Sequence, residues 1–155
     1  MTRDTKIVLA FIAGLPTLFL GAATLCTWAI AEGASPRWRL LFRIMCHGMP
    51  RRSLELFGTP MPLCARCVGI YAGMLLGILA FWAVPLMREK IMRGVALAAV
   101  TPMAIDGLTQ LTGLRESTNP LRLATGAVAG LAFGLWILSA VERRGRSNLQ
   151  ILDLT

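Results

Sequence analysis

Four long apolar stretches constrain this chain more than any other feature. Residues 7–31, 68–87 and 123–141 contain no charged side chain, and residues 94–114 contain only Asp106. Each stretch has about 20 residues, which as an α-helix covers a hydrocarbon core of roughly 30 Å. The alternation typical of strands is missing, so helices are the expected spanning form.

The sequence therefore predicts an all-α integral membrane protein, built as a four-helix bundle with a long first loop. We expect one domain over residues 1–155, with residues 142–155 forming a polar C-terminal tail. Only 15% of the residues are charged, against about a quarter in soluble domains. The first apolar run is longer than the core of a signal peptide, so we interpret it as an uncleaved helix.

The long first loop covers residues 32–63. Within it, residues 36–45 mix arginine with aromatic and aliphatic side chains. This pattern predicts a short helix in the membrane interface, with its arginines toward headgroups. An ordinary connector is the alternative.

The net charge of +8 is assigned to topology, lipid headgroups or an anionic ligand, and not to nucleic acid. Basic residues are equally numerous on the two sides of the four predicted spans, so the positive-inside rule does not decide the orientation alone. Because the arginines of one side lie among cysteines, we interpret them as site residues and expect both termini in the cytoplasm. Membrane lipids are the expected partners. A protein partner in a larger complex and the oligomeric state remain open.

Nearly all the distinctive polar residues converge on one end of such a bundle. With antiparallel helices, the first and third loops share an end with the start of 68–87 and the end of 94–114. A functional site is predicted there. Its candidate ligand-binding residues are Arg51, Arg52, Arg66, Gln110, Arg115, Ser117, Asn119 and Arg122.

Asp106 is the one acidic residue inside a predicted span. A charge at that depth is costly unless it is paired or protonated, which makes Asp106 a candidate catalytic residue together with Arg66, Cys64 and Cys67. Arg66, Arg115 or Arg122 is the natural partner. A salt bridge or hydrogen bond that only stabilises the bundle is the alternative.

Three cysteines and the only histidine lie within 22 residues of sequence. Cys64 and Cys67 are three residues apart, so on a helix they project to the same side. Together with Cys46 and His47 they make a Cys3His set suited to zinc. Adjacent residues on a helix point about 100° apart, so Cys46 and His47 could share an ion only from a turn, which Gly48 and Pro50 make plausible.

Two other uses of the cysteines stay open. One is a redox-active C-x-x-C dithiol that exchanges electrons with a membrane quinone, with Cys46 as resolving partner. The other is a structural disulfide in an accessory subunit or lipid-binding protein, whose arginines would hold an anionic headgroup. Cys26, inside the first apolar stretch, is expected to be a packing residue.

Small-residue ladders mark two of the predicted helices. Glycines recur every fourth residue at Gly69, Gly73 and Gly77, and again at Gly126, Gly130 and Gly134. Such ladders let helix backbones approach closely in lipid. We expect them to pack the bundle internally, with a homodimer face as the alternative.

Two patterns resemble the signature of a bacterial family of small membrane proteins known only as a domain of unknown function. The first is Cys46-His47-Gly48, then Arg52-Ser53, then Pro62 to Gly73 with Cys64-Ala65-Arg66-Cys67. The second is Asp106-Gly107-Leu108-Thr109-Gln110, then Gly113 to Asn119, Arg122 and Thr125-Gly126. The resemblance covers roughly residues 44–130. It implies a bacterial inner-membrane protein whose polar cluster is a family feature, and it implies no activity.

Overall fold

The computed structural model describes residues 3–81 and 89–152, and within them the chain is mostly helical. The main helices are α1 (Arg3–Ala31), α2 (Ala65–Phe81), α3 (Glu89–Leu111) and α4 (Asn119–Leu152). Three of them, α1, α3 and α4, are long and apolar enough to cross a membrane by length and composition. Helix α2 is a shorter helix of 17 residues that is apolar except for Arg66 in its first turn. The last part of the predicted span 68–87 lies outside the described residues.

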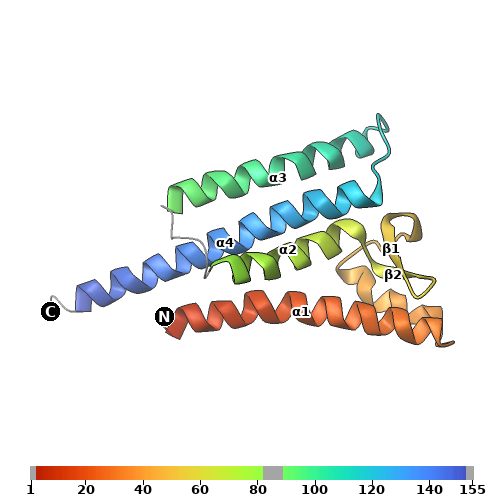
Figure 1. The fold of residues 1–155 in the computed structure, drawn as a ribbon, viewed down its shortest axis with the longest axis horizontal. Coiled ribbons are helices and arrows are strands. Elements are labelled where there is room, and N and C mark those ends of the chain that lie inside the picture. The colour runs from red at the N-terminus through yellow and green to blue at the C-terminus, as the bar shows by residue number, and fades with distance from the viewer. Residues whose placement is uncertain (1–2, 82–88, 153–155) are drawn as a thin grey trace.

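The helix boundaries differ from the predicted spans because helices continue beyond their apolar stretches. Helix α4 begins at Asn119 and extends to Leu152, so most of the predicted polar tail is helical. Its 34 residues correspond to roughly 50 Å, well beyond the thickness of a hydrocarbon core. Figure 1 shows its C-terminal end projecting past the other helices.

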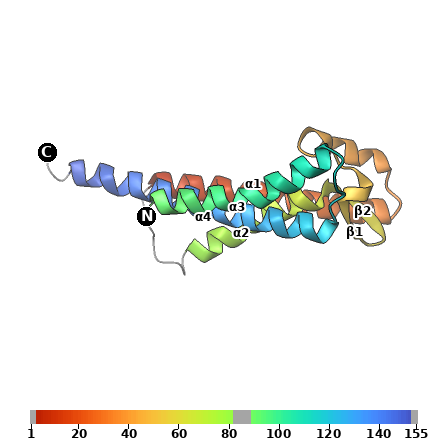
Figure 2. The same ribbon diagram turned by 90° about the horizontal axis from the view of Figure 1, so that it is seen from above.

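Helices α2 and α4 form the central pair of the fold, and their contact is the most extensive between any two elements. Helix α3 packs on α4, and α1 packs mainly on α2, which places α1 and α3 on opposite sides (Figure 1). The same arrangement is seen from above in Figure 2, where α3 and α4 run side by side.

The glycine ladders make the central contact possible. A Cβ atom added at Gly73 would lie 2.1 Å from the Ala127 carbonyl oxygen, and one at Gly130 would lie 2.2 Å from the Ile70 carbonyl oxygen. Real Cβ atoms essentially never come closer than about 3 Å to such atoms, so the two backbones touch where only hydrogen fits. The prediction that the ladders pack the bundle internally is confirmed.

The first loop contains two strands, which the prediction of an all-α fold did not include, although the described chain is mostly helical. Strand β1 (Ser53–Leu56) pairs antiparallel with β2 (Thr59–Cys64). Phe57 and Gly58 join them with φ of 55° and 67°, the positive values of a type I′ hairpin turn. Two prolines in β2 concealed the strand, since proline is tolerated mainly at sheet edges.

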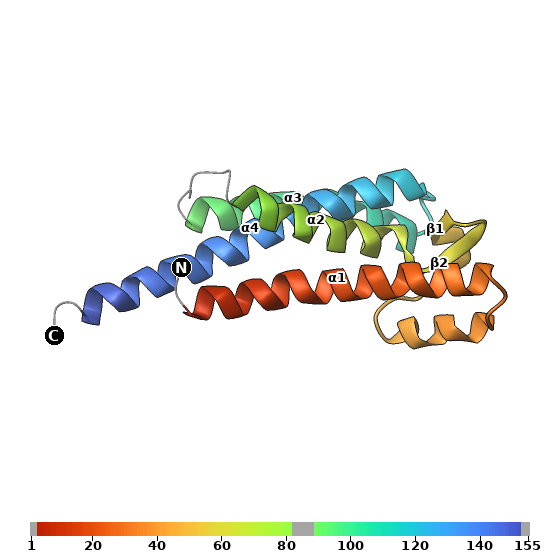
Figure 3. The same cartoon turned by 60° about the horizontal axis from the view of Figure 1, so that its bottom comes forward.

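The loop also contains the short helix that the sequence predicted. It is a 3-10 helix, η1 (Pro36–Ile44), and a second short turn, η2 (Pro50–Arg52), precedes the hairpin. Helix η1, in light orange in Figure 3, turns back alongside the end of α1. Phe42 is buried from this helix, whereas Trp38, Leu41 and Ile44 are exposed. This exposed apolar face suits contact with lipid.

Candidate functional site

The hairpin, the start of α2, the end of α3 and the start of α4 all meet at one end of the molecule (Figure 1). The hairpin sets the local geometry, because its register places Ser53 opposite Cys64. Cys64 is the last residue of β2, and α2 begins at the next residue. The C-x-x-C pair therefore spans the junction between strand and helix.

The sulfur atoms of Cys46, Cys64 and Cys67 all lie within 4.8 Å of one another. The backbone nitrogen of Cys64 donates a hydrogen bond to the sulfur of Cys46 over 3.2 Å. All four cysteines of the chain are free thiols in the structure, and Cys26 is outside this group. We call Cys46, Cys64 and Cys67 the sulfur cluster.

Apolar packing holds the sulfur cluster in place. Cys46 is buried with Ala23 of α1, Phe42 of η1, and Met61 and Leu63 of β2, and the other two cluster cysteines pack against the same core. Leu63 is fully buried. Because three separate elements contribute, the position of each sulfur depends on the folded loop and not on local sequence alone.

The electrostatics favour a thiolate at Cys46. Hydrogen bonds from the Cys64 and Cys67 side chains lower the pKa of the Cys46 thiol well below its ordinary value, although burial acts in the opposite direction. Backbone hydrogen bonds from Gly48 and Cys64 also lower this pKa. The thiolate is the form of cysteine that binds metals and acts as a nucleophile, so Cys46 is suited to either chemistry.

His47 is not a member of the sulfur cluster, so the structure groups three of the four residues of the predicted Cys3His set. Cys46 turns into the core while the adjacent His47 is exposed. His47 borders a cavity that Cys46 and Cys64 also line. The chain turns directly afterwards at Gly48, whose φ is 55° and whose added Cβ would lie 3.0 Å from the Pro62 carbonyl oxygen.

Asp106 forms an ion pair with Arg66, which settles the choice among the three predicted partners. The carboxylate oxygen also accepts a hydrogen bond of 2.9 Å from Gln110 Nε2. Asp106 is only 7% exposed, and a buried carboxylate needs a counter-charge. Arg66 provides it for the one carboxylate in the predicted spans. Ser117 is buried beside the same carboxylate.

Gln110 continues this network to α4. Its Oε1 accepts a hydrogen bond of 3.0 Å from Arg122 Nη2. Arg122 Nη1 donates to Asn119 Oδ1, also over 3.0 Å, and Asn119 Nδ2 donates to the Ser53 carbonyl oxygen. The network therefore connects α3, α4 and the hairpin, and Asn119 serves as a link between elements.

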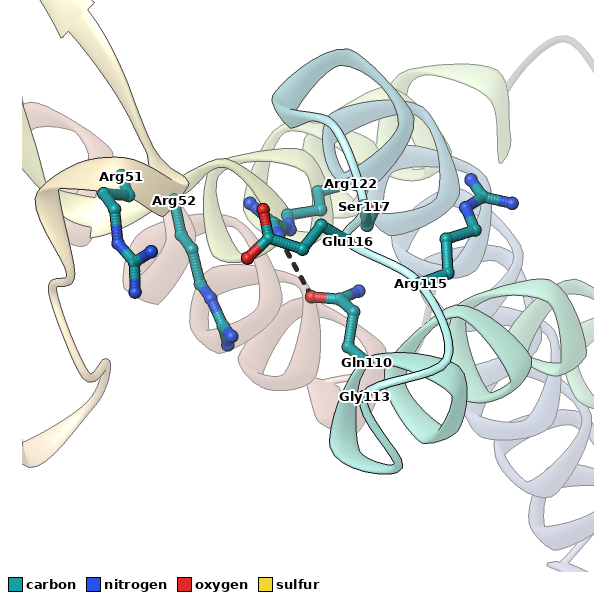
Figure 4. A pocket seen from close by; sticks show the side chains of 8 residues that line it. All are labelled: Arg51, Arg52, Gln110, Gly113, Arg115, Glu116, Ser117 and Arg122. Carbon is teal, nitrogen blue, oxygen red and sulfur yellow. Dashed lines mark hydrogen bonds between the residues drawn. The ribbon is translucent and has the colours of Figure 1, made fainter.

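Two cavities lie against this network. One, of about 290 Å³, is lined by Cys46, His47, Met49, Arg52, Cys64, Arg66, Gln110 and Arg122. The other, of about 240 Å³, is lined by Arg51, Arg52, Gln110, Gly113, Arg115, Glu116, Ser117 and Arg122. Figure 4 shows Arg51 and Arg52 extending from the same turn, while the Arg115 guanidinium is directed away from them. Asn119 lines neither cavity.

The candidate site residues inferred from the sequence do not include Ser53, Met49 or Glu116, which the structure places at the site. Ser53 contributes through its backbone carbonyl oxygen, which every residue type has, so its side chain gives no signal in the sequence. The hairpin, which the sequence did not predict, brings this oxygen to Asn119. Glu116 stands within a polar loop where its side chain gave no periodic signal.

Comparison with known proteins agrees with this description of the chain. Residues 46–136 match a family described as "Predicted membrane protein (DUF2085)". The chain belongs to this family. The DUF2085 match begins at Cys46 and contains the whole sulfur cluster and the Asp106–Arg122 network.

Two archaeal proteins are similar over 100 residues. The uncharacterized protein MJ1492 of Methanocaldococcus jannaschii is 44% identical over 63% of this chain, and the chain spans 64% of its length. An uncharacterized protein of Methanothermobacter thermautotrophicus is 42% identical over 64% of this chain and 88% of its own length. No solved structure matches. These relatives do not support the bacterial origin that the resemblance implied, since both are archaeal.

Proposed function

We propose that this chain is a four-span membrane protein that holds a metal ion, zinc or another thiophilic ion, in the sulfur cluster at one end of its helices. The observation behind the proposal is the mutual approach of Cys46, Cys64 and Cys67 within 4.8 Å. Tetrahedral zinc with Zn–S bonds of about 2.3 Å keeps its sulfurs about 3.8 Å apart. Small side-chain movements would bring the three sulfurs to that spacing.

Three protein ligands leave a fourth position. In zinc proteins this pattern is typical of sites that bind water or a substrate, whereas structural sites have four protein ligands. Cys46 and Cys64 border the cavity of about 290 Å³, so the fourth position would face that space. Arg52 and Arg66 line it as well, and their charge would offset the negative charge of three thiolates.

Metal analysis of the detergent-purified chain tests this proposal. We expect about one ion per chain in the wild type and its loss in Cys46→Ser, Cys64→Ser and Cys67→Ser. Cys26→Ser is the matched control, because Cys26 is a free thiol outside the cluster, and it should retain the ion. Metal-free wild-type protein with its cluster thiols paired as disulfides would refute the proposal.

Thiol–disulfide exchange with a quinone is the second candidate function. The observation in its favour is that three free sulfurs lie close enough to form alternative pairs, as a resolving mechanism requires. Quinone reduction by the purified, thiol-reduced chain would test it. Unchanged rates in Cys64→Ser and Cys67→Ser would exclude the cluster from such a reaction.

We also propose that both termini lie in the cytoplasm. Five basic residues near the site end take part in an ion pair or a hydrogen bond or line the polar cavities: Arg51, Arg52, Arg66, Arg115 and Arg122. If these five belong to the site and not to the topological signal, the basic residues of the terminal end decide the orientation. Reporter fusions at each terminus would measure this orientation. Fusions active outside the cytoplasm would reverse it.

A further inference from the structure

Arg122 is a buried cation without an anionic partner among the described residues. It is only 7% exposed, and its guanidinium donates hydrogen bonds to the neutral oxygens of Asn119 and Gln110. Its Nε atom is buried and has no hydrogen-bond partner. Burying a charge without compensation is costly, so this position is suited to an anion that the chain itself does not provide.

Arg122 lies where the two polar cavities adjoin. Both cavities are lined by Arg122, Arg52 and Gln110. Figure 4 shows the Arg52 side chain extending toward Gln110, which is joined to Arg122 by a hydrogen bond. Arg66 contributes to one cavity, and its buried Nε also has no partner. Arg52, Arg66 and Arg122 thus line the same cavity.

The charge of this region is positive even after internal compensation. Asp106 offsets Arg66, and Glu116 is the one carboxylate that lines either cavity. A thiolate or metal–thiolate cluster would offset one further charge. The three positive charges of Arg51, Arg52 and Arg122 outnumber the negative charges of Glu116 and the sulfur cluster, so the cavities attract anions.

We propose that the space around Arg52 and Arg122 binds an anion of the phosphate class. Guanidinium groups match phosphate oxygens because they donate two parallel hydrogen bonds in a plane. The end of a membrane helix bundle is also the level of lipid headgroups, so the phosphate belongs either to a phosphomonoester headgroup or to a soluble anion. This inference goes beyond the metal proposal, since it does not require an occupied sulfur cluster.

Calorimetric titration of the detergent-purified full chain tests the inference. The probes are inorganic phosphate and dihexanoyl phosphatidic acid, which carries the same group on a short lipid. We expect Arg52→Gln and Arg122→Gln each to weaken binding about tenfold or more, because each removes a charge-assisted contact. Arg37→Gln is the matched control: Arg37 is exposed on η1, at the same end of the molecule, and lines neither cavity.

The outcomes separate the sources and the two proposals. Binding of both probes would identify a soluble phosphate site, and binding of phosphatidic acid alone would identify a headgroup site. Cys67→Ser should lose metal yet keep anion affinity, since Cys67 lines neither polar cavity. Arg52 is exposed, so Arg52→Gln should fold even if Arg122→Gln does not. No binding of either probe, or equal weakening in Arg37→Gln, would overturn the inference.

Discussion

Gly73 of α2 faces Ala127 of α4 so closely that an added Cβ atom would lie 2.1 Å from the Ala127 carbonyl oxygen. Backbone atoms cannot yield as a flexible side chain does, so a methyl group there must separate the helices. We expect Gly73→Ala to destabilise the protein by about 2 kcal/mol or more. The temperature of unfolding in detergent is the measurement.

The matched control for Gly73→Ala is Gly21→Ala in α1, where nothing lies within 4 Å of the added atom. This change should be neutral or slightly stabilising, because alanine is the better helix former. Equal losses in both variants would mean that the α2–α4 contact is looser than described.

The exposed position of His47 leads to a prediction about metal binding. We expect His47→Ala to retain the metal stoichiometry of the wild type, whereas Cys67→Ser should lose the ion, since only the cysteine belongs to the sulfur cluster. Metal content by mass spectrometry distinguishes the two. Loss of the ion in His47→Ala would restore the four-ligand set that the sequence suggested.

Gly48 should control the sulfur cluster through the backbone. Gly48→Ala forces a side chain into positive φ and places its Cβ 3.0 Å from the Pro62 carbonyl oxygen, so Cys46 should move away from Cys64. We expect weaker metal affinity, measured by competition with a chelator. Gly58→Ala has a similar φ of 67° but open space around it, and it should keep the affinity.

Replacing the Asp106 carboxylate should lower the unfolding free energy, because it leaves Arg66 without an ion-pair partner. Asp106→Asn leaves the Arg66 guanidinium without its counter-charge, and we expect a loss of about 3 kcal/mol in unfolding free energy. The double variant Arg66→Gln/Asp106→Asn should lose less than the sum of the single changes, by at least about 1 kcal/mol.

Glu55→Gln is the control for this pair, because Glu55 is an exposed carboxylate in the hairpin. Its effect should stay within about 0.5 kcal/mol. Strictly additive losses in the double variant would show that Arg66 and Asp106 do not interact energetically.

The helical part of the fold could be predicted because uninterrupted apolar runs have few alternatives. The packing of the glycine ladders inside the bundle was also predictable, since their four-residue spacing defines one face of each helix. The hairpin was not, because β2 is only six residues long and contains two prolines. Its turn depends on positive φ at Phe57, a residue that rarely adopts it.

At the candidate site, the sequence grouped the three cysteines correctly, as far as the approach of their sulfurs tests it. The sequence also grouped His47 with the cysteines, whereas the structure leaves its side chain exposed beside the cluster. Adjacency in sequence does not reveal which side chain enters the core. Nor could the sequence choose the partner of Asp106. That choice depends on where the start of α2 lies relative to α3, which is a property of tertiary packing.

The backbone contact between α2 and α4 has a consequence for the spacing of the polar groups. An added Cβ at Gly126 would lie 2.5 Å from the carbonyl oxygen of Arg66, only one residue from Cys67, and Arg122 is one helical turn earlier on α4. Sliding one helix along the other would move the glycines out of register with the backbone atoms that they contact, and larger residues would meet those atoms instead. The close contact between carbonyls and glycines therefore fixes the register of α2 against α4. It thereby holds the distance between the thiols of α2 and the buried guanidinium of α4 constant.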